Sequence, residues 1–188
     1  MSNKSDNQIL KSNLSTLLKR FANTNVIEKF NDGSQNNTVY TIEVSNISNN
    51  RYLKNIEIDE KAISSVIKDI KYHGIISPLL VRTIEEGKYE LITGRTRFIC
   101  AKRLKLKNVP CMIQNFSDED MLLYMLFSYK MDKTKSVVEI ANICSVLCKK
   151  FHYTQSTIAD LLDISRAQVT NIIRILNLPK KVQKDVGK

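Results

Sequence analysis

The sequence predicts an α+β fold class in which a mixed domain is followed by an all-α domain. Residues 39–116 alternate short apolar runs of strand type with stretches of helical periodicity. Residues 117–188 show helical periodicity alone. Residues 1–38 are rich in Asn, Ser and Lys, which is typical of a segment that cannot bury a core. We therefore expect a flexible N-terminal tail over 1–38, an α+β domain over 39–116 and a helical domain over 117–188.

Length and composition exclude several classes of protein. The chain has 188 residues, of which 43% are hydrophobic, enough for one or two small domains. No apolar run approaches the roughly 20 residues of a membrane-spanning helix, and the N-terminus has no apolar signal core. The cysteines match no zinc-binding spacing, and Cys144 and Cys148, one helical turn apart, are expected to pack rather than react. These features predict a cytoplasmic protein without a metal site.

Within the tail, apolar residues recur at helical spacing and predict one short amphipathic helix. They are Ile9, Leu10, Leu14, Leu17, Leu18 and Phe21. The polar stretch 31–37 indicates a linker. We expect the tail to order on a partner.

The α+β domain is predicted to contain two helices and several strands. Asp59 suits the N-cap of a helix that runs to about Tyr72, and Gly74 suits its left-handed end. Residues 85–87 indicate a turn between two strands, and Gly94 is expected to open the second helix. Apolar alternation or a short apolar run predicts strands over 39–44, 76–83, 88–93 and 109–114.

The helical domain is predicted to contain five helices. The first begins near Ser117, because Glu119 and Asp120 suit the positive end of a helix dipole. The second runs from about Ser136 to Phe151, two shorter helices follow, and the last comes after Pro179.

The segment 154–176 has the spacing of a helix-turn-helix. Thr154 and Ser165 suit the N-caps of its two helices. Ala159 is small where the helices must cross closely, and Asp163 occupies the turn, where it tolerates a left-handed backbone. The residues expected to face inward are Ile158, Leu162, Val169 and Ile172. This spacing fixes two helices at a steep angle.

Such a motif places the N-terminal end of its second helix in the major groove of DNA. Arg pairs with guanine, and Gln or Asn pairs with adenine, so the outward residues are candidate base readers: Arg166, Gln168, Thr170 and Asn171. Phosphate contacts are expected from Thr154, Gln155, Ser165, Lys149 and Lys150. The alternative is an ordinary helical hairpin whose polar face is only solvated.

The distribution of charge favours a polyanionic partner for the helical domain. Of the net charge of +10, residues 121–188 carry +6, from 11 basic and 5 acidic residues. Residues 1–50 carry only +1, and residues 51–120 carry +3. The alternative is that these lysines only solvate helix surfaces.

Several segments, taken in order, resemble the ParB family of plasmid and chromosome partition proteins. GIISPLLVR (74–82) is similar to the family's G-I-x-Q-P-[IL]-x-V-R segment, and ELITGRTRFICAKRL (90–104) to its I-x-G-E-R-R-x-R-A-A segment. FSDED (116–120), the helix-turn-helix and RILNLP (174–179) follow in the family's order. The resemblance covers about residues 45–188 and implies a ParB/sulfiredoxin-like N-terminal domain before an all-α helix-turn-helix domain.

The resemblance implies that the N-terminal domain binds CTP with Mg²⁺ and, as in many members, hydrolyses it to control closure of a clamp on DNA. The first nucleotide box of the family is a Gly-Glu-Arg-Arg loop, where helix-start amides and a basic side chain hold phosphates. Here Gly94 and Arg97 are retained, whereas Arg95 replaces the Glu and Thr96 replaces the first Arg. The candidate nucleotide-binding residues are Ser77, Thr93, Gly94, Arg95, Thr96 and Arg97.

The family's second nucleotide box, Glu-Asn-x-x-Arg, falls at Ser128, Tyr129 and Asp132, and none of its three residues is present. The family uses that Glu and Asn to hold the metal of the nucleotide, and Mg²⁺ requires hard oxygen ligands. The sequence therefore names no catalytic residue, and the resemblance leaves only weak CTP hydrolysis open. The alternative to a phosphate site at 94–97 is a structural turn.

The N-terminal domain also resembles sulfiredoxin, an oxidoreductase that needs a Cys directly after the loop Gly. Here Arg95 takes that position, and Cys100 lies six residues beyond Gly94. We therefore expect Cys100 to lie in the core and not in an active site.

Family members often carry a short helix before the N-terminal domain that binds the ParA ATPase, with a basic residue that stimulates ATP hydrolysis. LSTLLKRF (14–21) has this character, and Lys19 and Arg20 are its candidate contacts to a partner ATPase. The alternative is a helix that packs on its own domain or on another subunit.

Together these features predict a nucleoid- or plasmid-associated protein that binds a centromere-like site on double-stranded DNA. A homodimer on an inverted repeat is expected, because one such module reads few bases. The alternatives are a transcriptional regulator or nucleoid-associated protein on the same fold, and a nucleotide-hydrolysing enzyme stimulated by DNA. Family members usually continue into a dimerisation domain beyond the equivalent of residue 188, so the chain is either a short form or a fragment.

Overall fold

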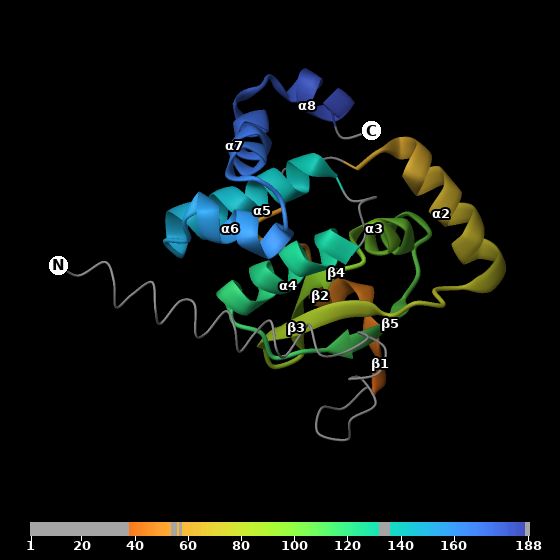
Figure 1. Ribbon diagram of the computed structural model, residues 1–188. Helices are drawn as coiled ribbons and strands as arrows, with labels where there is room; N and C mark the ends of the chain where they lie inside the picture. The colour runs from red at the N-terminus through yellow and green to blue at the C-terminus, as the bar shows by residue number, and fades with distance from the viewer. Residues whose placement is uncertain (1–37, 54–55, 57, 132–135, 187–188) are drawn as a thin grey trace. The chain divides into compact units, whose positions relative to one another are not determined.

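The computed structural model describes residues 38–53, 56, 58–131 and 136–186 (Figure 1). Val39–Lys188 forms one compact unit, so the segments 39–116 and 117–188 are described together. The amphipathic helix expected within 9–21 and the linker expected at 31–37 lie outside the described residues.

The expected strands and helices are confirmed, with small shifts at their ends. The strands are β1 Val39–Glu43, β2 Ile47–Ser48, β3 Leu79–Glu85, β4 Lys88–Thr93 and β5 Asn108–Ile113. The helices are α2 Glu60–His73, α3 Arg95–Arg103, α4 Asp118–Met131, α5 Val137–Lys150, α6 Gln155–Leu162, α7 Arg166–Arg174 and α8 Lys180–Val186. Two short 3₁₀ turns, η1 Val44–Asn46 and η2 Ile175–Asn177, and the two-residue strand β2 were not predicted, because such short elements leave no periodic pattern.

Strand β3 begins at Leu79, three residues later than the apolar pattern predicts. Pro78 precedes it and has no N–H to donate to a sheet. The backbone carbonyl oxygens of Ser77 and Pro78 instead accept hydrogen bonds from the Arg97 guanidinium. The strand also runs two residues beyond Thr83, so the turn to β4 is shorter than expected.

The five strands form one mixed sheet in the order β1-β5-β3-β4-β2. Strands β3 and β4 form an antiparallel hairpin. Strand β1 pairs with β5, which is also antiparallel but distant in the chain. The pairs β3–β5 and β2–β4 are parallel. Parallel neighbours require a crossover connection, and between β3 and β5 this connection runs through β4 and α3.

The core of the α+β part lies between the sheet and α3. Val81, Leu91 and Phe98 have no more than 1% of their surface exposed and belong to one apolar cluster. Helix α2 packs against α3 in a second cluster that contains Ile63 and Cys100. Asp59 caps α2 by accepting from the N–H of Lys61, as expected.

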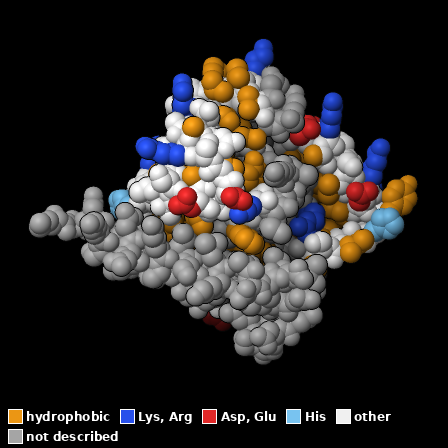
Figure 2. All heavy atoms as spheres, viewed as in Figure 1, with side chains coloured by type: hydrophobic (Ala, Val, Ile, Leu, Met, Phe, Trp, Pro, Cys, Tyr) orange, Lys and Arg blue, Asp and Glu red, His pale blue; other side chains and the backbone are white. Residues whose placement is uncertain are grey.

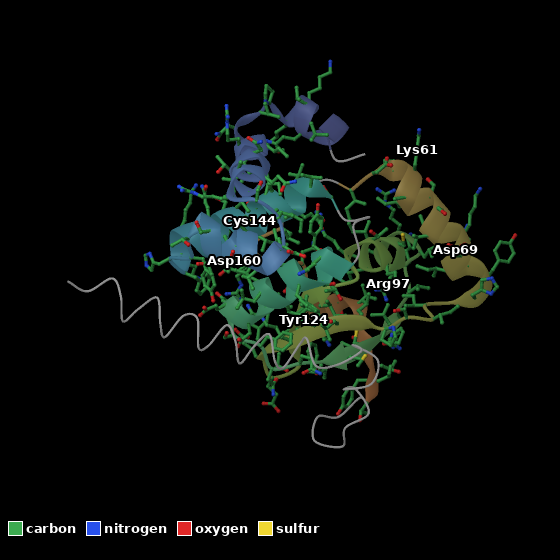
Figure 3. All side chains as sticks on the ribbon, in the orientation of Figure 1. Lys61, Asp69, Arg97, Tyr124, Cys144 and Asp160 are labelled. Atoms are coloured by element: carbon green, nitrogen blue, oxygen red, sulfur yellow. The ribbon has the colours of Figure 1, made fainter. Side chains whose placement is uncertain are left out.

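The helical part has its own core, formed by α4 to α7. Leu126, Ile140, Leu147 and Ile158 are at most 1% exposed. Cys144, labelled on α5 in Figure 3, is also fully buried. This core fixes α6 and α7, the two helices that carry the helix-turn-helix, on α4 and α5.

Candidate nucleic-acid interface

Helices α6 and α7 form the helix-turn-helix that the sequence predicts. The Thr154 hydroxyl accepts from the N–H of Thr157 at 3.0 Å and caps α6. Asp163 ends α6 in the left-handed conformation, with φ 58° and ψ 47°. Ser165 caps α7, as expected. The turn and both helix starts are therefore determined by side chains that the local sequence supplies.

Apolar contacts hold the two helices together. Ile158, Leu162 and Val169 are buried, which confirms three of the four residues expected to face inward. Ile172, the fourth, is only half-buried. Ala159 is 4% exposed, which fits its expected place at a close helix crossing.

The outward side of α7 carries the candidate base readers. Arg166, Gln168 and Asn171 are exposed, and Thr170 is half-buried. Arg174, near the end of the same helix, is also exposed and was not among the predicted site residues. Figure 2 shows Lys and Arg side chains projecting from the surface over α7 and α8. This part of the surface therefore combines cations with amide groups.

Gln168 takes part in the start of its own helix. Its Oε1 accepts from the backbone N–H of Ser165 at 2.8 Å, while its own N–H donates to the Ser165 hydroxyl. This reciprocal pair is a capping box. The acceptor atom of Gln168 is thus already used, and its role as a base reader stays a prediction.

Thr170 and Gln155 contact each other across the helix-turn-helix. The Thr170 hydroxyl donates to Gln155 Oε1 at 2.7 Å. The sequence predicts a phosphate contact for Gln155 and a base contact for Thr170. It does not predict the contact between them, because 15 residues separate them.

The two candidate phosphate contacts on α5 differ in their surroundings. Lys149 and Lys150 are both exposed in the last turn of α5. The Lys150 ammonium donates to Asp118 Oδ2 at 2.9 Å and to the Tyr52 hydroxyl at 2.6 Å. Lys149 makes no ion pair within the described part of the chain. A phosphate would therefore compete with a carboxylate for Lys150 but not for Lys149.

Asp118 belongs to a larger network of charges around β3 and β4. The Arg82 guanidinium bridges Glu90 at 2.6 Å and Asp118 at 2.5 Å, and Arg51 also donates to Glu90. Burial opposes the ionisation of Asp118, but hydrogen bonds from Tyr52, Arg82 and Lys150 outweigh it and hold its pKa well below the usual range.

Glu90 is the most deeply buried acid of this network, with 1% of its surface exposed. Burial would raise its pKa, yet the hydrogen bonds from Arg51 and Arg82 prevail and lower it. Both acids of the network, Glu90 and Asp118, are therefore charged at neutral pH.

Polar contacts attach α5 to the α+β part along its whole length. Arg95 pairs with Glu139 in the first turn of α5 at 2.5 Å. The Asn142 amide donates to the backbone oxygen of Tyr52, and Lys150 donates to the Tyr52 hydroxyl at the other end of α5. The sequence does not predict the contacts of Tyr52, Glu139 and Asn142, because an isolated polar residue carries no signal of a distant partner.

The loop at Gly94 combines a left-handed glycine with the start of a helix. Gly94 has φ 93°, and a Cβ there would lie 2.6 Å from Leu79 Cδ2, so the position requires glycine. Helix α3 starts at Arg95 without a side-chain cap. The first N–H groups of a helix have no intrahelical acceptor, so they can hold an anion.

The side chains of this loop are already engaged with protein groups. Arg97, labelled in Figure 3, donates to Pro78 O at 2.8 Å and also to Ser77 O, and burial lowers its pKa. Arg95 binds Glu139 and the backbone oxygen of Ile56. Thr93 and Thr96 are half-buried and Ser77 is exposed. Before they could bind a nucleotide phosphate, the guanidiniums of Arg95 and Arg97 would have to break these hydrogen bonds.

The described residues at the place of the second box offer no carboxylate to the metal of a nucleotide. Ser128 and Tyr129, at the place of the second box, lie on α4 and supply no carboxylate. Asp132 lies outside the described residues. In the part of the chain that the structure describes, no group of three His, Cys, Asp or Glu side chains could hold a metal ion.

Buried thiols have the surroundings of core residues. Cys100 is completely buried, and burial raises its pKa. Burial also raises the pKa of Cys111 and of Cys144 to about 12. The expectation that Cys100 packs in the core is confirmed.

Two further findings concern the predicted partners. Lys19 and Arg20, the candidate contacts to a partner ATPase, lie outside the described residues. Within the described segments, no helix combines the length and apolar character needed to cross a lipid bilayer.

Two family models match the chain and together cover most of it. Residues 28–128 match the ParB N-terminal domain, and residues 134–188 match the ParB HTH domain. A probable chromosome-partitioning protein ParB from Neisseria meningitidis is 32% identical over 152 residues, which are 81% of this chain and 53% of the relative. A nucleoid occlusion protein from Bacillus mycoides is 30% identical over 145 residues, 77% of this chain and 50% of the relative. The chain thus spans about half the length of these curated relatives.

Two solved structures of one relative match the chain. C-terminally truncated ParB from Caulobacter crescentus, complexed to the centromeric parS site, is 27% identical with a TM-score of 0.51. The match covers 77% of this chain and 75% of that one. The same protein complexed with CTP-gamma-S is 28% identical, with a TM-score of 0.47 over 79% of this chain and 84% of that one.

Proposed function

Because the chain belongs to the ParB family, we propose that it is a site-specific DNA-binding protein of the partition type, with α7 as its recognition helix. The observation that carries the proposal is the capped helix-turn-helix, whose second helix exposes Arg166 and Asn171. Such side chains on a helix of this kind reach base edges in the major groove.

The DNA site we propose is a centromere-like inverted repeat. The relative complexed to the centromeric parS site supports this choice, and residues 134–188, which contain α6 and α7, match the ParB HTH domain. One module reads too few bases for a unique genomic address, so two copies of the chain would bind two half-sites. Two-fold pairing places the half-sites about one helical turn apart, or a multiple of it.

A partner ATPase of ParA type belongs to the same proposal. The tail segment that contains Lys19 and Arg20 is its candidate contact. Deletion of residues 1–37 tests the tail, since the deleted segment contains none of the described helices and strands.

CTP is the nucleotide we propose for the loop at Gly94, held by first-turn N–H groups of α3 and by Arg97. Ser128 and Tyr129, the described residues of the second box, supply no carboxylate to Mg²⁺, so we propose binding that needs no metal. Calorimetric titration of CTP with Mg²⁺ or with EDTA tests this. Equal affinity in both is expected, and binding only with Mg²⁺ would contradict it. ATP and GTP serve as controls for the base.

The experiment that tests DNA binding is selection from a pool of random duplexes by the purified chain. Enrichment of one sequence with dyad symmetry is expected. Retention of all sequences alike would leave a non-specific DNA-binding protein, and no retention would exclude the proposed function. Competition with a duplex of scrambled sequence gives the specificity ratio, measured at two salt concentrations.

A further inference from the structure

The hydrogen bond between Thr170 and Gln155 joins the middle of α7 to the first residue of α6. The Thr170 hydroxyl oxygen lies 2.7 Å from Gln155 Oε1 and 3.0 Å from the backbone oxygen of Arg166. A hydroxyl carries one proton, so these two acceptors take the whole donor capacity of Thr170. Thr170 has no proton left for a hydrogen bond to a base.

The methyl group is what Thr170 retains for contact with DNA. A threonine methyl can pack against the C5-methyl group of thymine, which is the apolar feature of the major groove. Thr170 is half-buried on the same helix as Arg166 and Asn171, which are exposed. The hydrogen bond to Gln155 selects one orientation of the Thr170 side chain, and so it determines where the methyl lies.

Gln155 retains the complementary half of its amide. Its Oε1 accepts from Thr170, whereas no described residue accepts from its Nε2. The amide therefore still has N–H donors, and it lies at the N-terminus of α6 beside the cap residue Thr154. The first helix of a helix-turn-helix crosses the DNA backbone, where an amide donor suits a phosphate oxygen.

We propose that Gln155 is a positioning residue that binds a DNA phosphate through Nε2 and holds Thr170 through Oε1, so that Thr170 reads a thymine by its methyl group. The side-chain amide of Gln155 thus connects a contact to the DNA backbone with a contact to a base. The proposal rests on the proposed DNA-binding function, and it predicts that the two side chains act as a unit.

The test replaces thymine by deoxyuridine, one position at a time, in the duplex selected by the wild-type chain. Deoxyuridine lacks only the C5-methyl group, so its effect isolates the apolar contact. Fluorescence anisotropy with the wild-type chain should show a loss of about fourfold at one thymine of each half-site, the fold-change expected for one buried methyl group.

Three variants separate the contributions of the two residues. Thr170→Ser keeps the hydroxyl and removes the methyl, so its affinity should no longer depend on the C5-methyl. Thr170→Val keeps the methyl and loses the bond to Gln155. Gln155→Ala should weaken binding to every duplex and also reduce the deoxyuridine effect. The double variant Gln155→Ala/Thr170→Val should lose no more affinity than the worse single variant.

Thr41→Val, on the exposed face of β1, is the matched control and should bind as the wild type does. The proposal is wrong if Gln155→Ala keeps the full deoxyuridine effect, if Thr170→Ser keeps it, or if the two losses in affinity add. A wild-type chain that selects no sequence would overturn the proposed function itself. Thermal unfolding of each variant verifies that it is folded.

Discussion

The ammonium of Lys150 lies 2.9 Å from the carboxylate of Asp118, although 32 residues separate them in the chain. The contact links the last turn of α5 to the first turn of α4, next to the helix-turn-helix. Lys150, which the sequence predicts to contact a DNA phosphate, thus forms an ion pair within the protein. Because Asp118 also pairs with Arg82 of β3, the charges beside the helix-turn-helix depend on the α+β part as well.

Salt dependence should distinguish the two neighbouring lysines. Each phosphate neutralised by a lysine contributes a slope of about −0.9 to the dependence of log K on log salt. Lys149→Ala should therefore reduce the slope by about one unit, and Lys150→Ala by less, because Asp118 competes for that ammonium. In the background of Asp118→Asn, Lys150→Ala should have the full effect. Equal slopes for the wild type and every variant would show that neither lysine contacts DNA.

Arg166 is expected to read a base. Arg166→Ala should weaken binding to the selected site by about 1–3 kcal/mol and leave binding to scrambled duplex nearly unchanged. Arg174→Ala is the comparison, since it lies at the far end of α7 from the end that enters the groove. A loss for Arg166→Ala that is uniform across sequences would assign Arg166 to phosphate.

Stability should fall in acid because of the network around Asp118. The pKa values of Asp118 and Glu90 are lowered in the folded state, so both groups stabilise the fold above their unfolded pKa of about 4. This stabilisation is lost as the pH falls through the folded values. Chemical denaturation should show an unfolding free energy that declines below about pH 4.

Asp118→Asn should lower the unfolding free energy at pH 7 by about 1–3 kcal/mol and flatten its decline in acid. Asp69→Asn, an exposed position on α2, is the control and should do neither. An unchanged pH profile in Asp118→Asn would show that the network does not contribute to stability.

Gly94 should tolerate no side chain. Gly94→Ala forces a left-handed backbone on alanine and places its Cβ 2.6 Å from Leu79, so we expect a loss of about 1–3 kcal/mol or more. Gly87→Ala has a similar φ of 69° with nothing within 4 Å of the Cβ, and its cost isolates the backbone contribution. Equal melting temperatures of the two variants would show that the contact with Leu79 is harmless.

Native thiols should react slowly. Burial raises the pKa of Cys111 and of Cys144 to about 12, so neither is a thiolate at neutral pH. Cys148 is only half-buried and should be the first to react with a disulfide reagent. Titration in the native and the denatured state, with Cys148→Ser as the control, measures this order. Fast labelling of Cys144 in the native protein would contradict it.

Local signals allowed most of the fold to be predicted. Asp59, Thr154 and Ser165 act as the helix caps that their sequence positions indicate, and Asp163 adopts the left-handed turn. Each of these residues contacts a neighbour within a few positions, so the local sequence is enough to predict its role. The same holds for Gly94, which precedes α3 as the sequence predicts.

The candidate site was less predictable because its contacts are long-range. Gln155 bonds to Thr170, and Arg95 to Glu139, 44 residues away. Gln168 shows a different limit, since a residue chosen for its outward place also satisfies the start of its own helix. Periodicity indicates which way a side chain faces, but not which partner it finds there.

The pairing of β1 with β5 has a consequence for the order in which the protein is made. Val39 lies opposite Met112 in the sheet, and β1 has no other partner among the described strands. A ribosome releases the first strand long before it has made the fifth. The emerging β1, with Val39 and Tyr40 exposed even in the finished sheet, must therefore wait unpaired while α2, β3, β4 and α3 are synthesised. During synthesis this edge is the segment for which a chaperone would matter most.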